Sequence, residues 1–211
     1  MAWEVAARAA LAAADPVMAR LIVEHGELGP ASRRAAQPEA GAFGRLTRIV
    51  IGQQVSTAAA RTIHGRYLDL FGGAEPRPEQ VAAIGEEPLR GAGLSGRKVS
   101  YILGLADSTL SGELDLATLE TLDDDSVIET ISSLRGFGRW SAEMFCMFSL
   151  QRPDVFSGGD LGLRRGIQHA YRLDEAPSPD QAVAFAERWR PYRTIAAIYL
   201  WAAAAAPPLE D

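Results

Sequence analysis

The spacing of apolar residues is the sequence feature that most restricts the fold. Apolar residues recur every three to four positions in many stretches, which is the period of a helix with one buried face. No stretch of alternating β-branched residues is long enough to predict a central strand. We therefore expect an all-α fold, with helices at about residues 2–14, 16–25, 42–56, 57–71, 78–84, 95–111, 123–133, 139–150, 160–171, 178–190 and 193–206. The clearest helix start is Ser178, which is followed by a first-turn proline and by a glutamine at the third helical position.

The composition is that of a globular protein and excludes several kinds of site. The chain has 211 residues, 47% of them hydrophobic, which suits one large domain or two small lobes. Because Cys146 is the only cysteine, the chain cannot form an internal disulfide, a four-cysteine zinc site or a cysteine-ligated iron–sulfur cluster. The longest apolar run, residues 195–206, is too short for a membrane span, and the first residues do not resemble a signal peptide. We expect a cytoplasmic protein without a membrane partner.

Acidic and basic residues are separated along the chain. The formal net charge of −6 by itself argues against a nucleic-acid-binding protein. Residues 107–130, however, hold eight acidic residues and no basic residue. Residues 43–72, 88–101 and 131–173 each carry a net charge of +3. These basic segments contain glycine-rich turns, where backbone N–H groups can approach a phosphate. The alternative is that all these charges merely face solvent.

Two glycines separate an amphipathic helix from a second helix within residues 134–143. The sequence there is Leu-Arg-Gly-Phe-Gly-Arg-Trp-Ser-Ala-Glu. Gly136 and Gly138 can adopt positive φ and have no side chain, so successive amides can converge on one anionic oxygen. Such a turn binds the DNA backbone without reading the base sequence. The pattern alone is weak, because most such turns only connect two helices.

Further motifs follow this hairpin at a fixed distance. Asp154 begins the segment Asp-Val-Phe-Ser-Gly-Gly-Asp, whose last residue, Asp160, stands at the start of another helix. With these motifs the chain resembles the helix-hairpin-helix DNA glycosylases, and among them the alkylated-base glycosylases of the 3-methyladenine DNA glycosylase II type. The resemblance covers about residues 43–203 and includes the segments 51–56, 93–101 and 187–201.

The resemblance implies a bilobal, all-α helix-hairpin-helix DNA glycosylase fold without the extra N-terminal domain of larger relatives. One lobe is expected to comprise about residues 43–133, and the other residues 1–42 with 139–211. The hairpin, residues 134–139, is expected at their junction. The implied partner is double-stranded DNA with a damaged base, held between the lobes of a monomer.

Asp160 is the catalytic residue that the resemblance implies. Its carboxylate would stabilise the oxocarbenium-like charge that forms as an N-glycosidic bond breaks, or orient the attacking water. An alkylated purine is already a cationic leaving group and needs no strong general acid. Because Asp160 follows two glycines at the start of a helix, it can also be the N-cap of that helix, and the two roles can coexist.

Trp140 stands where strand-cutting relatives carry a Schiff-base lysine, so the resemblance implies a monofunctional enzyme that leaves an abasic site.

The resemblance also implies a pocket for the flipped base. Electron-rich aromatic faces hold a cationic base best. Trp140 and Trp201 match pocket positions of the family and are expected to stack on the base, although each can instead be a core residue. Met144 and Leu161 stand where some relatives carry pocket aromatics, so we expect a less aromatic pocket and a different range of bases.

Gln53 and Gln54 match the intercalating loop of the family, which fills the gap that a flipped base leaves. Gln54 is the better candidate for the wedge, although both can be ordinary polar turn residues. Arg135 replaces a proline common in the hairpin and is expected to add a phosphate contact or to loosen the turn. Contacts with the DNA backbone are expected from two turns, namely from Gly136, Phe137, Gly138, Arg139, Ser95, Gly96 and Lys98.

No cofactor is expected apart from a structural cation. A monovalent cation held by main-chain carbonyls is known in the superfamily. Leu134 and Gly136 supply the candidate carbonyls for Na⁺ or K⁺ here, and no other metal site is expected.

The function that the resemblance implies is hydrolysis of the N-glycosidic bond of alkylated purines, such as 3-methyladenine and 7-methylguanine, in duplex DNA during base excision repair. Two alternatives remain open. The first is a glycosylase of the same fold for another lesion, such as ethenoadenine, hypoxanthine or an oxidised base. The second is a non-catalytic helix-hairpin-helix module that only binds DNA, which Asp160 at the matching spacing disfavours.

Overall fold

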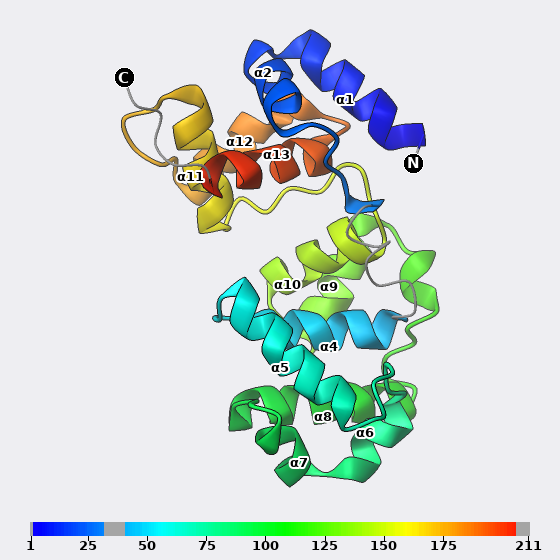
Figure 1. Cartoon of the computed structure of the whole chain (residues 1–211). Coiled ribbons are helices and arrows are strands. Elements are labelled where there is room, and N and C mark those ends of the chain that lie inside the picture. Colours follow the sequence, from blue (N-terminus) through cyan, green and yellow to red (C-terminus); the bar gives the residue numbers. More distant parts are fainter. Residues whose placement is uncertain (1, 32–40, 206–211) are drawn as a thin grey trace. The chain divides into compact units, whose positions relative to one another are not determined.

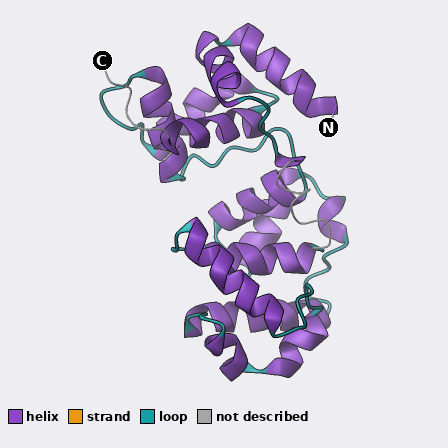
Figure 2. Ribbon diagram, in the orientation of Figure 1, coloured by secondary structure: helices purple, strands orange, loops and turns teal. Residues whose placement is uncertain are grey.

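The structure contains helices and connecting loops but no strand in the residues that it describes. It is a computed structural model that describes residues 2–31 and 41–205 (Figure 1, Figure 2). The predicted all-α fold is therefore confirmed. No helix in the described part of the chain is both long and apolar enough to cross a lipid bilayer. The chain divides into two compact units, the terminal unit of residues 1–36 and 146–211 and the central unit of residues 37–145.

Helix α4 lies at the middle of the central unit. The unit consists of α4 (Ala42–Gly52), α5 (Thr57–Asp69), α6 (Pro78–Ile84), α7 (Glu86–Gly91), α8 (Gly96–Leu110), a 3₁₀ turn (Thr118–Glu120), α9 (Asp124–Ser133) and α10 (Arg139–Met144). Helix α4 packs against α5, α8 and α10 (Figure 1). Leu46 and Val50 on α4 are fully buried. The turn that follows α4 is thereby held against the hairpin between α9 and α10.

Helix α13 lies at the middle of the terminal unit. The described helices of this unit are α1 (Ala2–Ala14), α2 (Pro16–His25), α11 (Leu161–Tyr171), α12 (Pro179–Ala186), a 3₁₀ turn (Glu187–Trp189) and α13 (Arg193–Ala205). Every residue of α13 from Thr194 to Leu200 is buried, and the helix packs against α1, α2 and α11. At Gly166 the helices α11 and α13 approach so closely that a Cβ atom would lie 2.3 Å from the carbonyl oxygen of Leu200.

Asp15 connects the two N-terminal helices to the remainder of the terminal unit. Its carboxylate caps α2 by accepting from the amides of Val17 and Met18, at 2.9 and 3.4 Å. It also accepts hydrogen bonds from the hydroxyl of Tyr171 and from Nε1 of Trp189. Burial raises the pKa of Asp15, but the four hydrogen bonds outweigh burial and hold this pKa below its ordinary value.

The boundary between the two units and the extent of one predicted helix differ from the prediction. Residues 139–145 belong to the central unit rather than to the lobe with residues 146–211, because the short hairpin turn packs α10 directly against α9. The helix predicted over 139–150 ends at Met144 and continues as a π-helical turn over Phe145–Ser149.

The predicted helix boundaries hold where a cap defines them. At Ser178 the side chain accepts from the amide of Gln181, and the Gln181 side chain accepts from the amide of Ser178, as expected for a capping box. The helix predicted over 42–56 instead ends at Gly52, and the one predicted over 178–190 gives way to a 3₁₀ turn after Ala186. Helix α7 was not predicted.

Candidate functional site

Asp160 is the N-cap of α11 and carries an oriented carboxylate. Its Oδ1 accepts a hydrogen bond from the amide of Leu163 at 2.8 Å and another from Nε1 of Trp201 at 3.0 Å. The side chain is half-buried. A Cβ atom on Gly162 would lie 3.0 Å from Oδ1 and 3.1 Å from Cδ1 of Trp201, so the absence of a side chain there lets the indole approach the carboxylate. The predicted capping role is confirmed, and it fixes the direction in which the carboxylate points.

The loop that leads to Asp160 is fastened to the start of α13. Arg193 donates from Nε to Oδ1 of Asp154 at 2.8 Å, and its second guanidinium arm donates to the Asp154 main-chain carbonyl at 2.7 Å. The buried hydroxyl of Thr194 accepts from the amide of Val155 at 3.1 Å. At Gly158 a Cβ atom would lie 2.8 Å from a main-chain carbonyl oxygen of α12. The loop therefore has little freedom to move the carboxylate.

The predicted pocket residues of the terminal unit lie around this carboxylate. The ring of Trp201 is half-buried and packs against that of Phe148, with 5.9 Å between ring centroids. Leu161 follows Asp160 and is 48% exposed. Asp160, Trp201 and Leu161 are thus brought together, and Phe148 is an aromatic neighbour that the sequence pattern did not single out.

Only one of the two hairpin glycines of the central unit has a positive φ, because Gly138 has φ −106°. Gly136 has φ +92°, and a Cβ atom there would lie 2.2 Å from Cγ of Tyr101 on α8. Gly138 is the N-cap of α10, where no side chain caps the first amides, and a Cβ atom on it would meet nothing within 4 Å. The amide of Phe137 donates to the carbonyl of Leu134 at 3.1 Å, and its ring is buried. Phe137 therefore anchors the turn, and its amide is engaged within the turn.

The two glutamines after α4 occupy different environments. Gln54 is exposed and has φ +56°. Gln53 is half-buried, and its amide nitrogen donates to the carbonyl of Gly136 at 3.0 Å and to Oγ of Ser141 at 3.2 Å. Gln53 therefore joins the turn to the hairpin in this structure, whereas Gln54 faces solvent.

The turn before α8 is tied to the end of α4. Ser95 is the N-cap of α8 and accepts from the amide of Lys98 at 3.3 Å, and Gly96 beside it is exposed. The Lys98 ammonium donates to the carbonyl of Ile51 at 2.8 Å, and burial lowers the pKa of Lys98. Lys98 therefore caps the last turn of α4, as lysines near helix C-termini commonly do.

The remaining predicted residues lie on the hairpin and on α10. Trp140 is 39% exposed, whereas Met144 is 7% exposed. The guanidinium of Arg139 donates to the buried carboxylate of Glu143 at 2.9 Å, and Arg135 is exposed. Trp140 and Met144 lie in the central unit and Asp160 in the terminal unit, so the predicted site residues form two groups, each with its own local geometry.

The two carbonyls expected to hold a monovalent cation each accept a hydrogen bond. The Leu134 carbonyl accepts from the amide of Phe137, and the Gly136 carbonyl accepts from Gln53. A carbonyl oxygen has two lone pairs, so one remains at each of these atoms. The oxygens thus fit a cation as ligands, but Gln53 already supplies a positively polarised group at Gly136.

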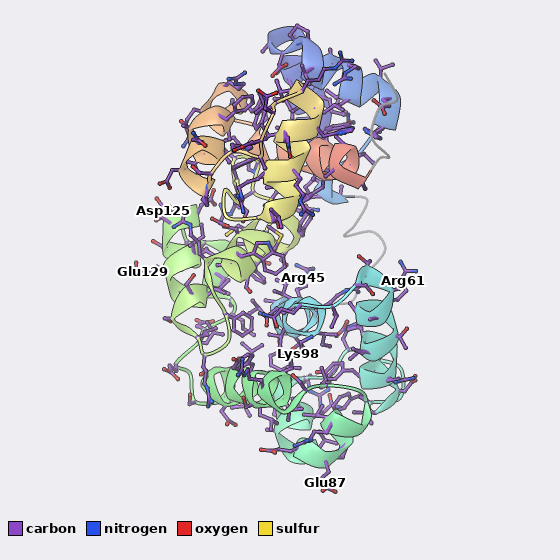
Figure 3. All side chains as sticks on the ribbon, turned by 90° about the vertical axis from the view of Figure 1, so that its left-hand side faces the viewer. Arg45, Arg61, Glu87, Lys98, Asp125 and Glu129 are labelled. Carbon is purple, nitrogen blue, oxygen red and sulfur yellow. The ribbon has the colours of Figure 1, made fainter. Side chains whose placement is uncertain are left out.

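The acidic side chains of α9 project from a different side of the central unit than Arg61 does. Figure 3 shows Asp125 and Glu129 projecting from α9, and Arg61 projecting from α5 at the opposite side of the unit, with Arg45 and Lys98 between them. The acidic stretch 107–130 covers the end of α8, the 3₁₀ turn and α9. Within this unit, the acidic helix lies away from the arginine on α5.

Comparisons with known proteins agree on one family. Residues 47–191 match the family model described as HhH-GPD superfamily base excision DNA repair protein. DNA-3-methyladenine glycosylase 1 of Schizosaccharomyces pombe is 34% identical over 161 residues, which cover 75% of this chain and 71% of that protein. Putative DNA-3-methyladenine glycosylase YfjP of Bacillus subtilis is 30% identical over 162 residues, which cover 74% of this chain and 56% of that protein.

A solved structure extends this similarity to the fold. The S. pombe 3-methyladenine DNA glycosylase in complex with abasic DNA superposes with a TM-score of 0.85 at 29% sequence identity. The superposition covers 97% of this chain and 99% of that chain.

Proposed function

The chain belongs to the HhH-GPD superfamily of base excision DNA repair proteins, and on this premise we propose that it is a monofunctional DNA glycosylase for alkylated purines in duplex DNA. Its relatives are named DNA-3-methyladenine glycosylases, and the similarity spans three quarters of the chain. The observation that carries the proposal is the Asp160 carboxylate, which the amide of Leu163 and the indole of Trp201 hold in one orientation beside an exposed leucine.

Asp160 acts on the sugar rather than on the base. As the bond between C1′ and the base nitrogen breaks, its electron pair leaves with the base, and the positive charge of the alkylated purine is neutralised. The sugar gains oxocarbenium-like charge, which the Asp160 carboxylate stabilises. A water oxygen then bonds to C1′, and the carboxylate accepts one proton of this water. The products are the free base and an abasic site.

Trp140 supports the absence of strand cleavage. A glycosylase that also cuts the strand needs an amine that forms a Schiff base with the sugar. Trp140 stands at the hairpin position of that amine, and Lys98, the chain's one lysine, donates to the carbonyl of Ile51 instead. The reaction consumes only water, and we propose that the enzyme works as a cytoplasmic monomer without a redox or organic cofactor.

We propose that the hairpin, the turn after α4 and the turn before α8 bind the DNA. We propose that Gly138 and the first amides of α10 hold a backbone phosphate, that Gln54 fills the gap left by the flipped base, and that Trp140 and Trp201 contact that base. A monovalent cation on the carbonyls of Leu134 and Gly136 would add a positive charge at the hairpin. Met144 is aliphatic and buried, and Leu161 is aliphatic, which supports a pocket with fewer aromatic contacts than that of some relatives.

Asp160→Asn tests the catalytic assignment. Asparagine is also a good N-cap and can still accept from Leu163 and Trp201, so the fold should be retained. We expect base release from duplexes with a single 7-methylguanine or 3-methyladenine to fall by about 10²–10³-fold, the range seen when a charge-stabilising group is removed. Asp174→Asn, on an exposed loop of the same unit, is the matched control and should behave as the wild type.

The outcomes separate the candidate functions. Release of ethenoadenine, hypoxanthine or an oxidised base, without release of the methylated purines, would establish a different lesion range. Wild-type protein that binds DNA but releases no base from any lesion duplex would refute the enzymatic proposal. Strand nicking without added alkali would refute the monofunctional mechanism.

A further inference from the structure

A pocket of about 240 Å³ lies beside the turn that carries the wedge candidate. It has room for several water molecules, at about 30 Å³ each. It is formed where α4 ends and α5 begins, and its lining contains two arginines and no acidic residue. The lining residues are Arg48, Gly52, Val55, Thr57, Ala60 and Arg61.

The two arginines line the same pocket, and the charge of Arg61 acts on Arg48. Arg48 on α4 is half-buried, and Arg61 on α5 is exposed. Burial lowers the pKa of the Arg48 guanidinium, the charge of Glu75 raises it, and the charge of Arg61 lowers it by a smaller amount. Glu75 also lies 3.4 Å from Nε2 of His64. An anion bound in the pocket would relieve the repulsion between the two guanidinium groups.

The lining suits a phosphate group in particular. Arginine presents a planar fork of donors that matches two phosphate oxygens, and two such forks can bind one phosphate from two sides. Thr57 adds a hydroxyl at the first residue of α5, a helix of 13 residues whose N-terminal dipole favours negative charge. Val55 and Ala60 provide an apolar wall, which strengthens the electrostatic interactions.

We propose that this two-arginine pocket binds one backbone phosphate of the DNA next to the flipped nucleotide. The proposal rests on the proposed function, because it takes Gln54 as the wedge. Val55, which lines the pocket, directly follows Gln54, and consecutive Cα atoms are about 3.8 Å apart. A duplex whose base stack is entered by Gln54 therefore brings its sugar–phosphate backbone to the pocket.

Arg61→Ala tests the proposal, since Arg61 is exposed and its loss should not affect folding. The assay is binding to a duplex with a stable abasic-site analogue, measured by fluorescence anisotropy over a series of salt concentrations. We expect a roughly tenfold lower affinity, and a slope of log K against log salt that is smaller by about 0.9, the contribution of one phosphate contact. The matched control Arg77→Ala removes the same charge from an exposed position of the same unit and should leave both values unchanged.

A scan of single neutral methylphosphonates along both strands identifies the phosphate. We expect one position near the abasic site to weaken binding of the wild type, and the same position to have no further effect on Arg61→Ala. Arg48→Lys, which retains charge but loses the fork, should show an intermediate effect at that position. If Arg61→Ala is as sensitive as the wild type at every position, the pocket does not bind the DNA backbone.

Two further measurements distinguish this proposal from its alternatives. If inorganic phosphate raises the melting temperature of the wild type but not of Arg61→Ala, while the two salt slopes are equal, the pocket binds a free anion and the DNA assignment is wrong. The single-turnover rate of base release at saturating enzyme should be the same for the control Arg77→Ala and wild type. Because the main readout is binding, a protein that binds but releases no base would refute the proposed function and leave this test intact.

Discussion

Replacing Gly136 with alanine should destabilise the central unit through two separate effects. A residue with a side chain at φ +92° is strained by about 1–2 kcal/mol. The new Cβ atom would also lie 2.2 Å from Cγ of Tyr101, and relieving such an overlap in a packed region costs about 1–3 kcal/mol. We therefore expect the free energy of unfolding to fall by about 2–5 kcal/mol, a large part of the 5–15 kcal/mol typical of a domain.

Urea unfolding followed by far-ultraviolet circular dichroism measures this change, provided that the m values agree between variants. Gly138→Ala is the matched control two residues away, because Gly138 has φ −106° and open space around its Cβ position, and it should change stability by less than about 1 kcal/mol. In the double variant with Tyr101→Ala the overlap disappears and only the backbone strain remains. The two substitutions should therefore be less destabilising together than the sum of their separate effects, by about 1–3 kcal/mol. Strict additivity, or a change below about 0.5 kcal/mol for Gly136→Ala, would show that the Tyr101 ring does not support the hairpin.

Three other substitutions test contacts within each unit. Trp201→Phe keeps an aromatic ring but removes the hydrogen-bond donor to Asp160. The single-turnover rate of base release should therefore fall at least about tenfold, with DNA affinity nearly unchanged. An equal loss of rate and affinity would indicate that Trp201 acts only by stacking. Gln53→Ala should lower affinity for abasic-analogue DNA by releasing the wedge turn from Gly136, and an altered salt slope would instead mean that Gln53 binds a phosphate. The folded-state pKa of Asp15 is lowered, so its stabilisation is complete above the ordinary carboxyl value of 3.8 and is lost as the pH falls through the lower folded value. Asp15→Asn should accordingly weaken the acid dependence of unfolding, and an unchanged pH profile would contradict this reasoning.

Local patterns were sufficient to predict most helices and the cap at Asp160. The capping box at Ser178 lies within four residues, and the N-cap bond of Asp160 spans three, so both depend on interactions that a short segment makes by itself. The end of α4 at Gly52 was harder to predict, because the apolar pattern continues to Val55. There the chain leaves the helix since Gln53 and Lys98 make tertiary contacts at its last turn.

The different roles of the two glutamines could not be predicted from their positions in the sequence. The bond from Gln53 to the Gly136 carbonyl spans 83 residues and exists only because α4 packs against α10. A one-residue difference along the turn therefore separates Gln53, which is half-buried against the hairpin, from Gln54, which is exposed. The pocket between Arg48 and Arg61 has the same origin, because only the packing of α4 against α5 brings the two side chains together.

Fewer basic side chains are available to bind DNA than the segment charges suggest, because some of them already have partners within the protein. The three basic segments each carry +3, but several of their cations are engaged within the protein. Lys98 donates to the Ile51 carbonyl, Arg139 to the Glu143 carboxylate, and Arg164 to the carbonyl of Pro177. A cation that is already bonded internally releases fewer counterions from DNA, since it must exchange one partner for another. The salt dependence of DNA binding should therefore be well below what the segment charges suggest, and a small number of arginines, Arg61 among them, should account for most of it.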